Sequence, residues 1–133
     1  MLRYLLDTNI LIYTIKSRPK VVRQKFEAHA GEIRASSVTA MELLYGAHKS
    51  QAVRRNLDVI EGLLDRLDLM DFDLIAAEHA GQIRAERAAS GSTIGPFDVM
   101  IAGHARSRGM CLITTKERAF ARGSGLRLAN WAK

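Results

Sequence analysis

The sequence predicts an α/β fold, in which a central, mainly parallel sheet of short strands is flanked by helices. A length of 133 residues suits one domain, which we expect to span residues 1–133. Hydrophobic residues make up 47% of the chain and charged residues 26%, which is typical of a globular protein. Short apolar runs of strand length alternate with longer segments of helical periodicity, and this alternation favours a parallel sheet.

The first half of the chain begins with a strand-like run. Residues 2–6 are mostly apolar and are followed by the polar residues Asp7, Thr8 and Asn9, which predicts a short strand. Behind Pro19, a residue suited to a helix start, Val22, Phe26 and Ala30 recur at every fourth position, as on one face of a helix. The expected elements of this half are a strand at 2–6, helices at 10–16 and 19–30, a strand at 33–37 and a helix at 39–49.

The second half continues the alternation. An apolar stripe at helical spacing predicts one helix, and it consists of Val53, Leu57, Ile60, Leu64 and Leu67. Gly91 and Gly109 predict the ends of two further helices, and Pro96 suits the start of the second. The expected elements of this half are a helix at 53–67, a strand at 67–70, helices at 74–90 and 97–108, and strands at 111–114 and 126–128.

Composition excludes several classes of protein. The single cysteine, Cys111, excludes a disulfide scaffold and a zinc site built on a cysteine cluster. Strongly apolar runs such as residues 9–13 are far shorter than the ~18 residues that a membrane span requires. The N-terminal segment reaches Asp7 before the apolar core of a signal peptide is complete. We therefore expect a soluble cytoplasmic protein.

The charge of the chain indicates a polyanionic partner. Lys and Arg number 20 against 14 Asp and Glu, which gives a net charge of +6. Nucleic acid is the simplest partner for such a surface. The C-terminal part is especially basic and contains a single acid, Glu117; its basic residues are Arg106, Arg108, Lys116, Arg118, Arg122, Arg127 and Lys133. Charge alone does not separate a nuclease from a protein that only binds nucleic acid.

Three acids lie at junctions between predicted elements. Asp7 directly follows the first strand, Glu42 lies early in the helix after the second strand, and Asp98 lies in the first turn of the helix that Pro96 opens. Ligand sites of parallel α/β sheets lie beyond the carboxyl ends of the strands. We therefore expect Asp7, Glu42 and Asp98 to gather at one edge of the sheet.

Each acid also has a purely structural interpretation. Asp7 suits the cap of the following helix, Glu42 completes a capping-box pattern with Thr39, and Asp98 suits the positive end of a helix dipole. Their joint position favours a site, because gathered carboxylates repel one another unless a cation neutralises them. Mg²⁺ or Mn²⁺ is the natural ion for oxygen ligands. An acidic metal site within a basic surface is expected for phosphodiester cleavage.

Five ordered motifs resemble those of PIN-domain proteins of the VapC toxin family. They are LLDTNI at 5–10, SVTAMELLYGA at 37–47, GPFDVMIAGHA at 95–105, the segment from LITT at 112–115 through Phe120, and LRLANW at 126–131. The match runs through the chain in order and at the right spacing. GQIRAE at 81–86 and SRG at 107–109 resemble the enterobacterial-type subgroup in particular.

The resemblance implies a single PIN domain and a small Mg²⁺-dependent endoribonuclease, with Mn²⁺ as a possible substitute. Such a protein is the toxin of a type II toxin–antitoxin pair and inhibits translation; it is usually a homodimer and is inhibited by a cognate VapB-like antitoxin. The subgroup cuts the anticodon loop of initiator tRNA, which is therefore the expected substrate. Carried over by position, the catalytic and metal-binding acids are Asp7, Glu42 and Asp98, and the supporting residues are Thr8, Asn9 and Thr114.

One position departs from the family pattern. Many PIN domains have a fourth acid, or an asparagine, two residues after the threonine that ends the strand; after Thr114 this position holds Lys116. The neighbouring Glu117 either substitutes as a metal ligand or is only a charge at a helix start. A Lys116 side chain that points into the site would touch phosphate and weaken binding of a second metal ion. Lys116 and Arg118 are the expected RNA contacts of this segment.

Two other classes of function remain open. A metal-independent ribonuclease would use a His or Arg acid–base pair, but the sequence offers no paired-histidine motif, so the acids favour a metal. A non-catalytic nucleic-acid adaptor would explain the charge, but it would leave the three acids unexplained.

Apolar residues crowd the predicted helix at 39–49 more densely than one buried face needs. These residues are Ala40, Leu43, Leu44, Tyr45 and Ala47. We therefore expect a homodimer, together with an antitoxin segment that covers an apolar groove beside the site. An antitoxin arginine that reaches the acids would inhibit well, because it replaces the charge of the metal.

Overall fold

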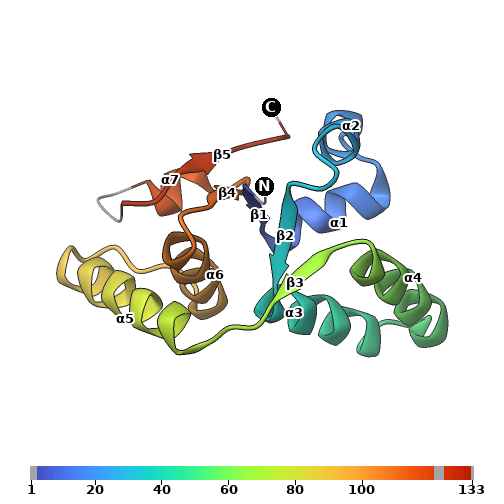
Figure 1. The fold of residues 1–133 in the computed structure, drawn as a ribbon. Helices are drawn as coiled ribbons and strands as arrows, with labels where there is room; N and C mark the ends of the chain where they lie inside the picture. The colour runs from blue at the N-terminus through green and yellow to red at the C-terminus, as the bar shows by residue number, and fades with distance from the viewer. Residues whose placement is uncertain (1–2, 122–124, 133) are drawn as a thin grey trace.

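The computed structural model describes residues 3–121 and 125–132, and it confirms the α/β fold (Figure 1). The described residues form one sheet of five parallel strands that is flanked by helices. The strands are β1 (Tyr4–Leu6), β2 (Ile33–Ser36), β3 (Asp68–Met70), β4 (Cys111–Ile113) and β5 (Leu128–Ala129). The helices are α1 (Thr8–Lys16), α2 (Lys20–Ala28), α3 (Ser37–His48), α4 (Val53–Asp65), α5 (Leu74–Ala89), α6 (Pro96–Ser107) and α7 (Glu117–Phe120).

The order of the strands places a switch point beside β1. The sheet runs β3-β2-β1-β4-β5, so the chain builds outward from β1 first to one side and then to the other. β1 therefore pairs with β2 on one edge and with β4 on the other. In an open parallel sheet, the carboxyl ends of the strands at such a reversal border a crevice that suits a ligand.

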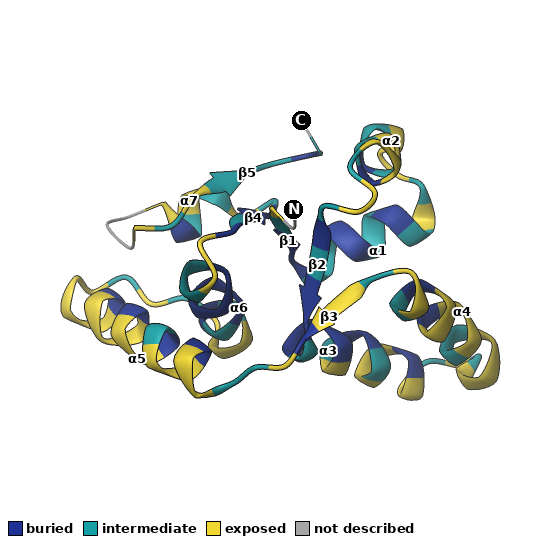
Figure 2. Ribbon diagram, viewed as in Figure 1, coloured by how far each residue is buried: buried dark blue, intermediate teal, exposed yellow. Residues whose placement is uncertain are grey.

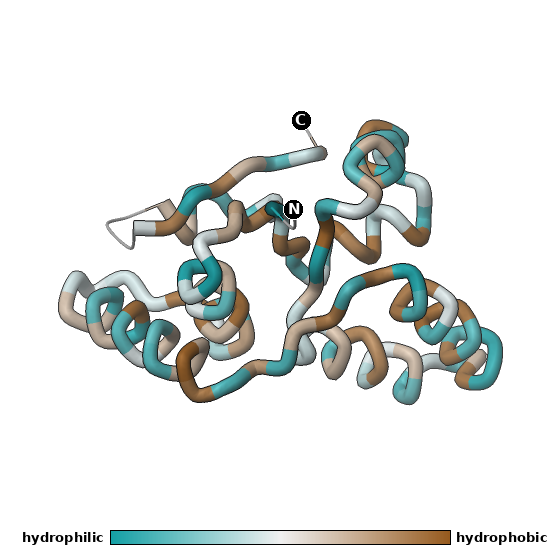
Figure 3. Tube along the Cα trace, viewed as in Figure 1, coloured by the Kyte–Doolittle hydropathy of each residue, from teal (hydrophilic) through white to brown (hydrophobic). Residues whose placement is uncertain are grey.

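The sheet separates two apolar cores. Successive side chains of a strand point to opposite faces, so Leu5 and Leu6 of β1 enter different cores, and both are fully buried. The core around Leu6 is covered by α1 to α4, and the core around Leu5 is covered by α5 to α7. Figure 2 shows the buried faces of the helices turned toward the interior, against the sheet or a neighbouring helix, and Figure 3 shows apolar residues on these faces.

Several boundaries differ from those expected. α1 begins at Thr8 because Asp7 caps it, and α3 begins at Ser37 because the hydroxyl of Ser36 accepts a hydrogen bond from the amide of Val38. Thr39 therefore lies inside α3, and the interpretation of Glu42 as part of a capping box is wrong. Helices α5 and α6 end as expected, with Gly91 and Gly109 at positive φ just beyond them.

The C-terminal part contains the largest differences. β5 covers Leu128–Ala129 rather than 126–128, and the short helix α7 begins at Glu117, as one of the two interpretations of that residue implied. Of the sequence features named above, Leu2 of the first strand and the basic residues Arg122 and Lys133 lie outside the described residues.

Candidate carboxylate site

Asp7 lies at the switch point of the sheet and links three elements. It directly follows β1, and its amide donates to the carbonyl of Ile113 at the end of β4, at 3.0 Å. Its Oδ1 accepts a hydrogen bond from the amide of Ile10 at 3.0 Å, so the carboxylate caps α1. The Thr114 hydroxyl, beyond the end of β4, also hydrogen-bonds to the carboxylate. Asp7 is therefore the helix cap that the sequence allowed, and it also lies at the strand-end edge.

Burial dominates the electrostatics of Asp7. The residue is only 3% exposed, and this burial raises the pKa of its carboxyl above the ordinary value; the nearby charge of Asp98 acts in the same direction. The hydrogen bonds from Thr114 and Ile10 and the charge of Lys116 lower the pKa, but they do not cancel the effect of burial. An ionised carboxylate in this position is stabilised by a cation.

Glu42 reaches the same edge from α3. Its Oε1 accepts a hydrogen bond from the Thr8 hydroxyl at 2.5 Å, and Thr8 is the first residue of α1. The Thr8 hydroxyl also lies 3.3 Å from the Thr39 hydroxyl. Thr39 precedes Glu42 by three positions and so shares its face of α3. This contact of Thr39 was missed because the sequence pattern assigned that residue to a helix cap.

Asp98 and Lys116 form an ion pair across the site. Asp98 lies in the first turn of α6, and its Oδ2 is 2.9 Å from the Nζ of Lys116, which precedes α7. Both side chains are partly exposed, at 25% for Asp98 and 42% for Lys116. Lys116, which departs from the acid or asparagine of many PIN domains, thus supplies a positive charge to the site.

The charges of all three predicted acids act on the ammonium of Lys116. Burial of the ammonium lowers the pKa of Lys116, but the hydrogen bond and charge of Asp98, together with the charges of Asp7 and Glu42, outweigh it, so the pKa is raised. The fold therefore brings elements that are distant in the sequence to one centre. Within residues 3–121 and 125–132, no three His, Cys, Asp or Glu side chains already lie together as ligands of one metal ion. Asp98 contacts the ammonium of Lys116 directly, whereas Asp7 and Glu42 act on it through their charges.

The other predicted site residues lie on the same elements. Thr114 is fully buried, and its hydroxyl accepts a hydrogen bond from the amide of Lys116 at 3.0 Å. Asn9 is half-buried in the first turn of α1. Glu117 is half-buried in the first turn of α7, and Arg118 follows it with its side chain exposed.

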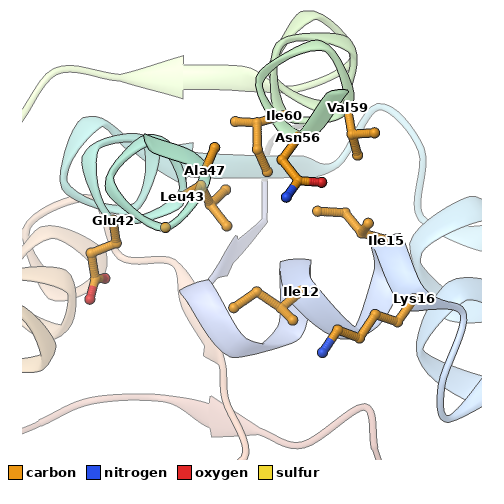
Figure 4. Close-up of a pocket in the computed structure, with 10 residues that line it drawn as sticks. Ile12, Ile15, Lys16, Glu42, Leu43, Ala47, Asn56, Val59 and Ile60 are labelled. Carbon is orange, nitrogen blue, oxygen red and sulfur yellow. The ribbon is translucent and has the colours of Figure 1, made fainter. Parts of the chain in front are cut away.

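A groove of about 380 Å³ opens beside Glu42, between α1, α3 and α4 (Figure 4). Figure 4 shows Leu43, Ile60 and Ile15 around it, and Glu42 at its edge. Its lining consists of Ile12, Ile15, Lys16, Glu42, Leu43, Gly46, Ala47, Asn56, Val59 and Ile60. The apolar groove expected beside the site is therefore present.

Among residues 3–121 and 125–132, the helices are too short or too polar to span a membrane.

Comparison with known proteins gives consistent matches over nearly the whole chain. The family model of the PIN domain matches residues 4–126. The chain is 55% identical over 132 residues to a protein of Shigella flexneri named tRNA(fMet)-specific endonuclease VapC, covering 99% of this chain and 100% of that protein. It superposes with a TM-score of 0.93 and 50% identity on a chain of DNA-bound VapBC from Salmonella typhimurium, covering 98% and 99% of the two chains. It also superposes on a chain of VapBC-1 from nontypeable Haemophilus influenzae, with a TM-score of 0.88, 33% identity, and coverage of 99% and 100%.

The raised pKa of Asp7 predicts that its ionised carboxylate lowers the free energy of unfolding at neutral pH, and that Asp7→Asn removes this effect. Asparagine also caps helices, so the start of α1 is preserved. At pH 7 without metal, we expect Asp7→Asn to melt roughly 2–5 °C above the wild type. Because the native pKa of Asp7 is raised, its protonated carboxyl stabilises the fold at low pH. This stabilisation is lost as the pH rises through the native pKa. The difference in melting temperature should therefore shrink as the pH falls toward 4.

Asp73 provides a matched control, because its pKa is shifted in the direction opposite to that of Asp7. It caps α5 through the amide of Ala76, and its hydrogen bond from Arg108 holds the pKa of its carboxyl below the ordinary value. Asp73→Asn should therefore lower the melting temperature at pH 7, and this loss should diminish as the pH falls through the native pKa of Asp73. A lower melting temperature for Asp7→Asn at pH 7 would contradict the electrostatic account of Asp7.

Proposed function

The chain belongs to the PIN-domain family and is a ribonuclease of its VapC branch; from this premise, we propose that Asp7, Glu42 and Asp98 cleave initiator tRNA with the help of a bound Mg²⁺ ion. The observation that supports this proposal is the convergence of the three carboxylates on Lys116 at the switch point of the sheet. The protein acts as the toxin of a toxin–antitoxin pair, and we place it in the cytoplasm, with its substrate.

The donor set fits a hard divalent cation. Mg²⁺ prefers oxygen ligands and is commonly held by one or two carboxylates, with water and phosphate completing its shell. Asp7 supplies a buried carboxylate with a raised pKa, and Glu42 and Asp98 supply two more accessible ones. When bound, such an ion activates water and stabilises the negative charge that develops on the phosphate. Mn²⁺, which also takes oxygen ligands, is the expected substitute.

The chain's own residues orient these acids and hold the RNA. Thr114 and the Ile10 amide fix the carboxylate of Asp7, and Thr8 fixes that of Glu42. The ammonium of Lys116 pairs with Asp98 but is partly exposed, so it can also contact a phosphate that enters the site. Arg118 adds positive charge from α7, Asn9 is a supporting residue of the site in the first turn of α1, and we assign Glu117 as a charge at the start of α7.

The choice of tRNA rests on the relatives. Two of them, from Shigella flexneri and Salmonella typhimurium, are named tRNA(fMet)-specific endonucleases and are 55% and 50% identical to this chain. The net charge of +6 suits a polyanionic substrate, because basic side chains bind phosphates and release counterions.

The groove beside Glu42 suits the cognate antitoxin. Its lining is mostly apolar and lies between three helices, as in the docking of an amphipathic helix. Glu42 links the groove to the carboxylate site, so an antitoxin segment in the groove ends near the acids. An arginine of that segment would pair with the carboxylates and occupy the place of the metal charge.

An exposed apolar face of α3 suits a homodimer. Met41 and Tyr45 lie one turn apart and are 41% and 62% exposed, whereas Leu43 and Ala47 are buried in the core. Leu74 and Ile75 expose further apolar surface at the start of α5. Apolar residues that are this exposed favour association, because pairing removes them from water.

Cleavage should depend on a divalent metal and on the acids. Antitoxin-free protein should cut initiator tRNA with Mg²⁺ or Mn²⁺ and stop in EDTA. Asp98→Asn and Glu42→Gln should each lower the rate by about 100-fold or more, because each removes a ligand charge. Asp73→Asn, outside the site, should retain wild-type activity. The cleavage rates are measured by following the tRNA fragments on gels.

The outcomes of that assay separate the classes of function. Full activity in EDTA would favour a metal-independent ribonuclease. Tight tRNA binding without cleavage under every metal condition would favour a non-catalytic adaptor.

A charge in the groove should weaken antitoxin binding and leave cleavage intact. Val59 lines the groove and is 44% exposed. Val59→Glu should weaken the affinity for the antitoxin encoded beside this toxin by about tenfold in calorimetry, because a carboxylate replaces an apolar contact. Val53, at the start of the same helix and 37% exposed, is the matched control. Equal affinities for Val59→Glu and Val53→Glu would contradict docking in this groove.

The dimer should depend on the exposed face of α3. At micromolar concentration, light scattering of the antitoxin-free protein should give about twice the chain mass of 14.8 kDa. Tyr45→Glu should shift the mass toward one chain, because it places a charge in the apolar contact. Val53→Glu should remain dimeric. A monomeric wild type would refute the proposed dimer.

A further inference from the structure

The main chain of Lys116 is fixed on both sides. Its amide donates to the hydroxyl of Thr114 at 3.0 Å, and Thr114 is itself fully buried at the end of β4. Its carbonyl accepts hydrogen bonds from the amides of Ala119 and Phe120, at 3.0 and 3.3 Å, which closes the single turn of α7. Phe120 is buried in the core beneath this turn. The side chain of Lys116 therefore starts from a defined point at the rim of the site.

The ammonium of Lys116 lies among the acids rather than in solvent alone. It pairs with Asp98 at 2.9 Å and also interacts with the charges of Asp7 and Glu42. Its side chain is 42% exposed, so it is neither locked in the core nor free on the surface. One ammonium compensates one of the three carboxylate charges, and the two that remain match the charge of one divalent ion. A second divalent ion would give the centre an excess of positive charge.

We propose that Lys116 serves as a built-in cation that holds the three carboxylates together before metal binds and limits the site to one divalent ion. This inference rests on the proposed function of the carboxylate site. In this role, Lys116 is a positioning residue, because it acts through the carboxylates. Its charge both stabilises the metal-free site and weakens the attraction of the site for an incoming cation.

Charge variants of Lys116 test the proposal without an activity assay. The antitoxin-free chain is melted in EDTA and titrated calorimetrically with Mn²⁺, with Lys20→Met as the control, since Lys20 is exposed at the start of α2. Lys116→Met should melt about 3 °C or more below the wild type in EDTA. It should also bind Mn²⁺ about tenfold more tightly, since a like charge has been removed. Lys116→Arg should retain the wild-type values for both measurements.

Stoichiometry provides an independent measurement. The wild type should bind one Mn²⁺ ion per chain, whereas Lys116→Asp, which replaces the ammonium with a fourth carboxylate, should bind two. If Lys116→Met folds only when Mn²⁺ is present, this supports the proposal, because the ion then supplies the missing charge. If it fails to fold with Mn²⁺ as well, the proposal is overturned.

The results also separate this inference from the proposed function. Unchanged melting temperature and Mn²⁺ affinity in Lys116→Met would overturn the inference, even if the wild type cleaves tRNA with Mg²⁺. A wild type that binds two Mn²⁺ ions would overturn it as well. A wild type that binds one Mn²⁺ ion but cleaves no RNA would overturn the proposed function and leave the role of Lys116 standing.

Discussion

The carboxylate of Asp7, buried at the switch point of the sheet, is the constraint on which the rest of the site depends. One of its oxygens caps α1, and its amide and its partner Thr114 connect it to the end of β4. A charge removed from water at this point is costly unless a cation lies near it. Asp7 therefore starts α1, bonds to the end of β4 and requires a cation nearby. The elements that pack around it must also supply that positive charge.

The negative charges of the site are gathered locally, whereas the positive charge is spread over the whole chain. Asp98 pairs with the ammonium of Lys116, and the charges of Asp7 and Glu42 act on the same group, while the chain as a whole carries a net charge of +6. At physiological salt the screening length is about 8 Å, so each region mainly affects groups close to it. A polyanion is attracted by the basic surface, whereas the acidic centre attracts small cations. RNA binding and metal binding can thus occur side by side without cancelling each other.

The sequence predicted the architecture better than it predicted the local details around Asp7, Glu42 and Asp98. Short apolar runs located the buried strands β1, β2 and β4, and helical periodicity and glycine or proline signals located the helices α1 to α6, because these elements contribute buried side chains to the two cores. α7 has a single turn, too short for a periodic signal, and its position depends on the burial of Phe120. The pattern of Thr39 and Glu42 resembled a capping box, but Ser36 caps α3 instead. Likewise, sequence position identified Lys116 as unusual, but the direction of its side chain depends on tertiary contacts.

Glu42 gives the carboxylate site and the groove a common wall. Its Oε1 is held by Thr8 on the site side, while its neighbours on α3, Leu43 and Gly46, line the groove (Figure 4). α3 is anchored in the core by Leu43 and Ala47, so this wall belongs to a packed helix rather than to a loop. A segment that fills the groove therefore meets Glu42 by direct contact. Control of the nuclease by a groove-bound antitoxin then requires no rearrangement of the sheet, because occupying the groove already places the partner next to one of the three acids.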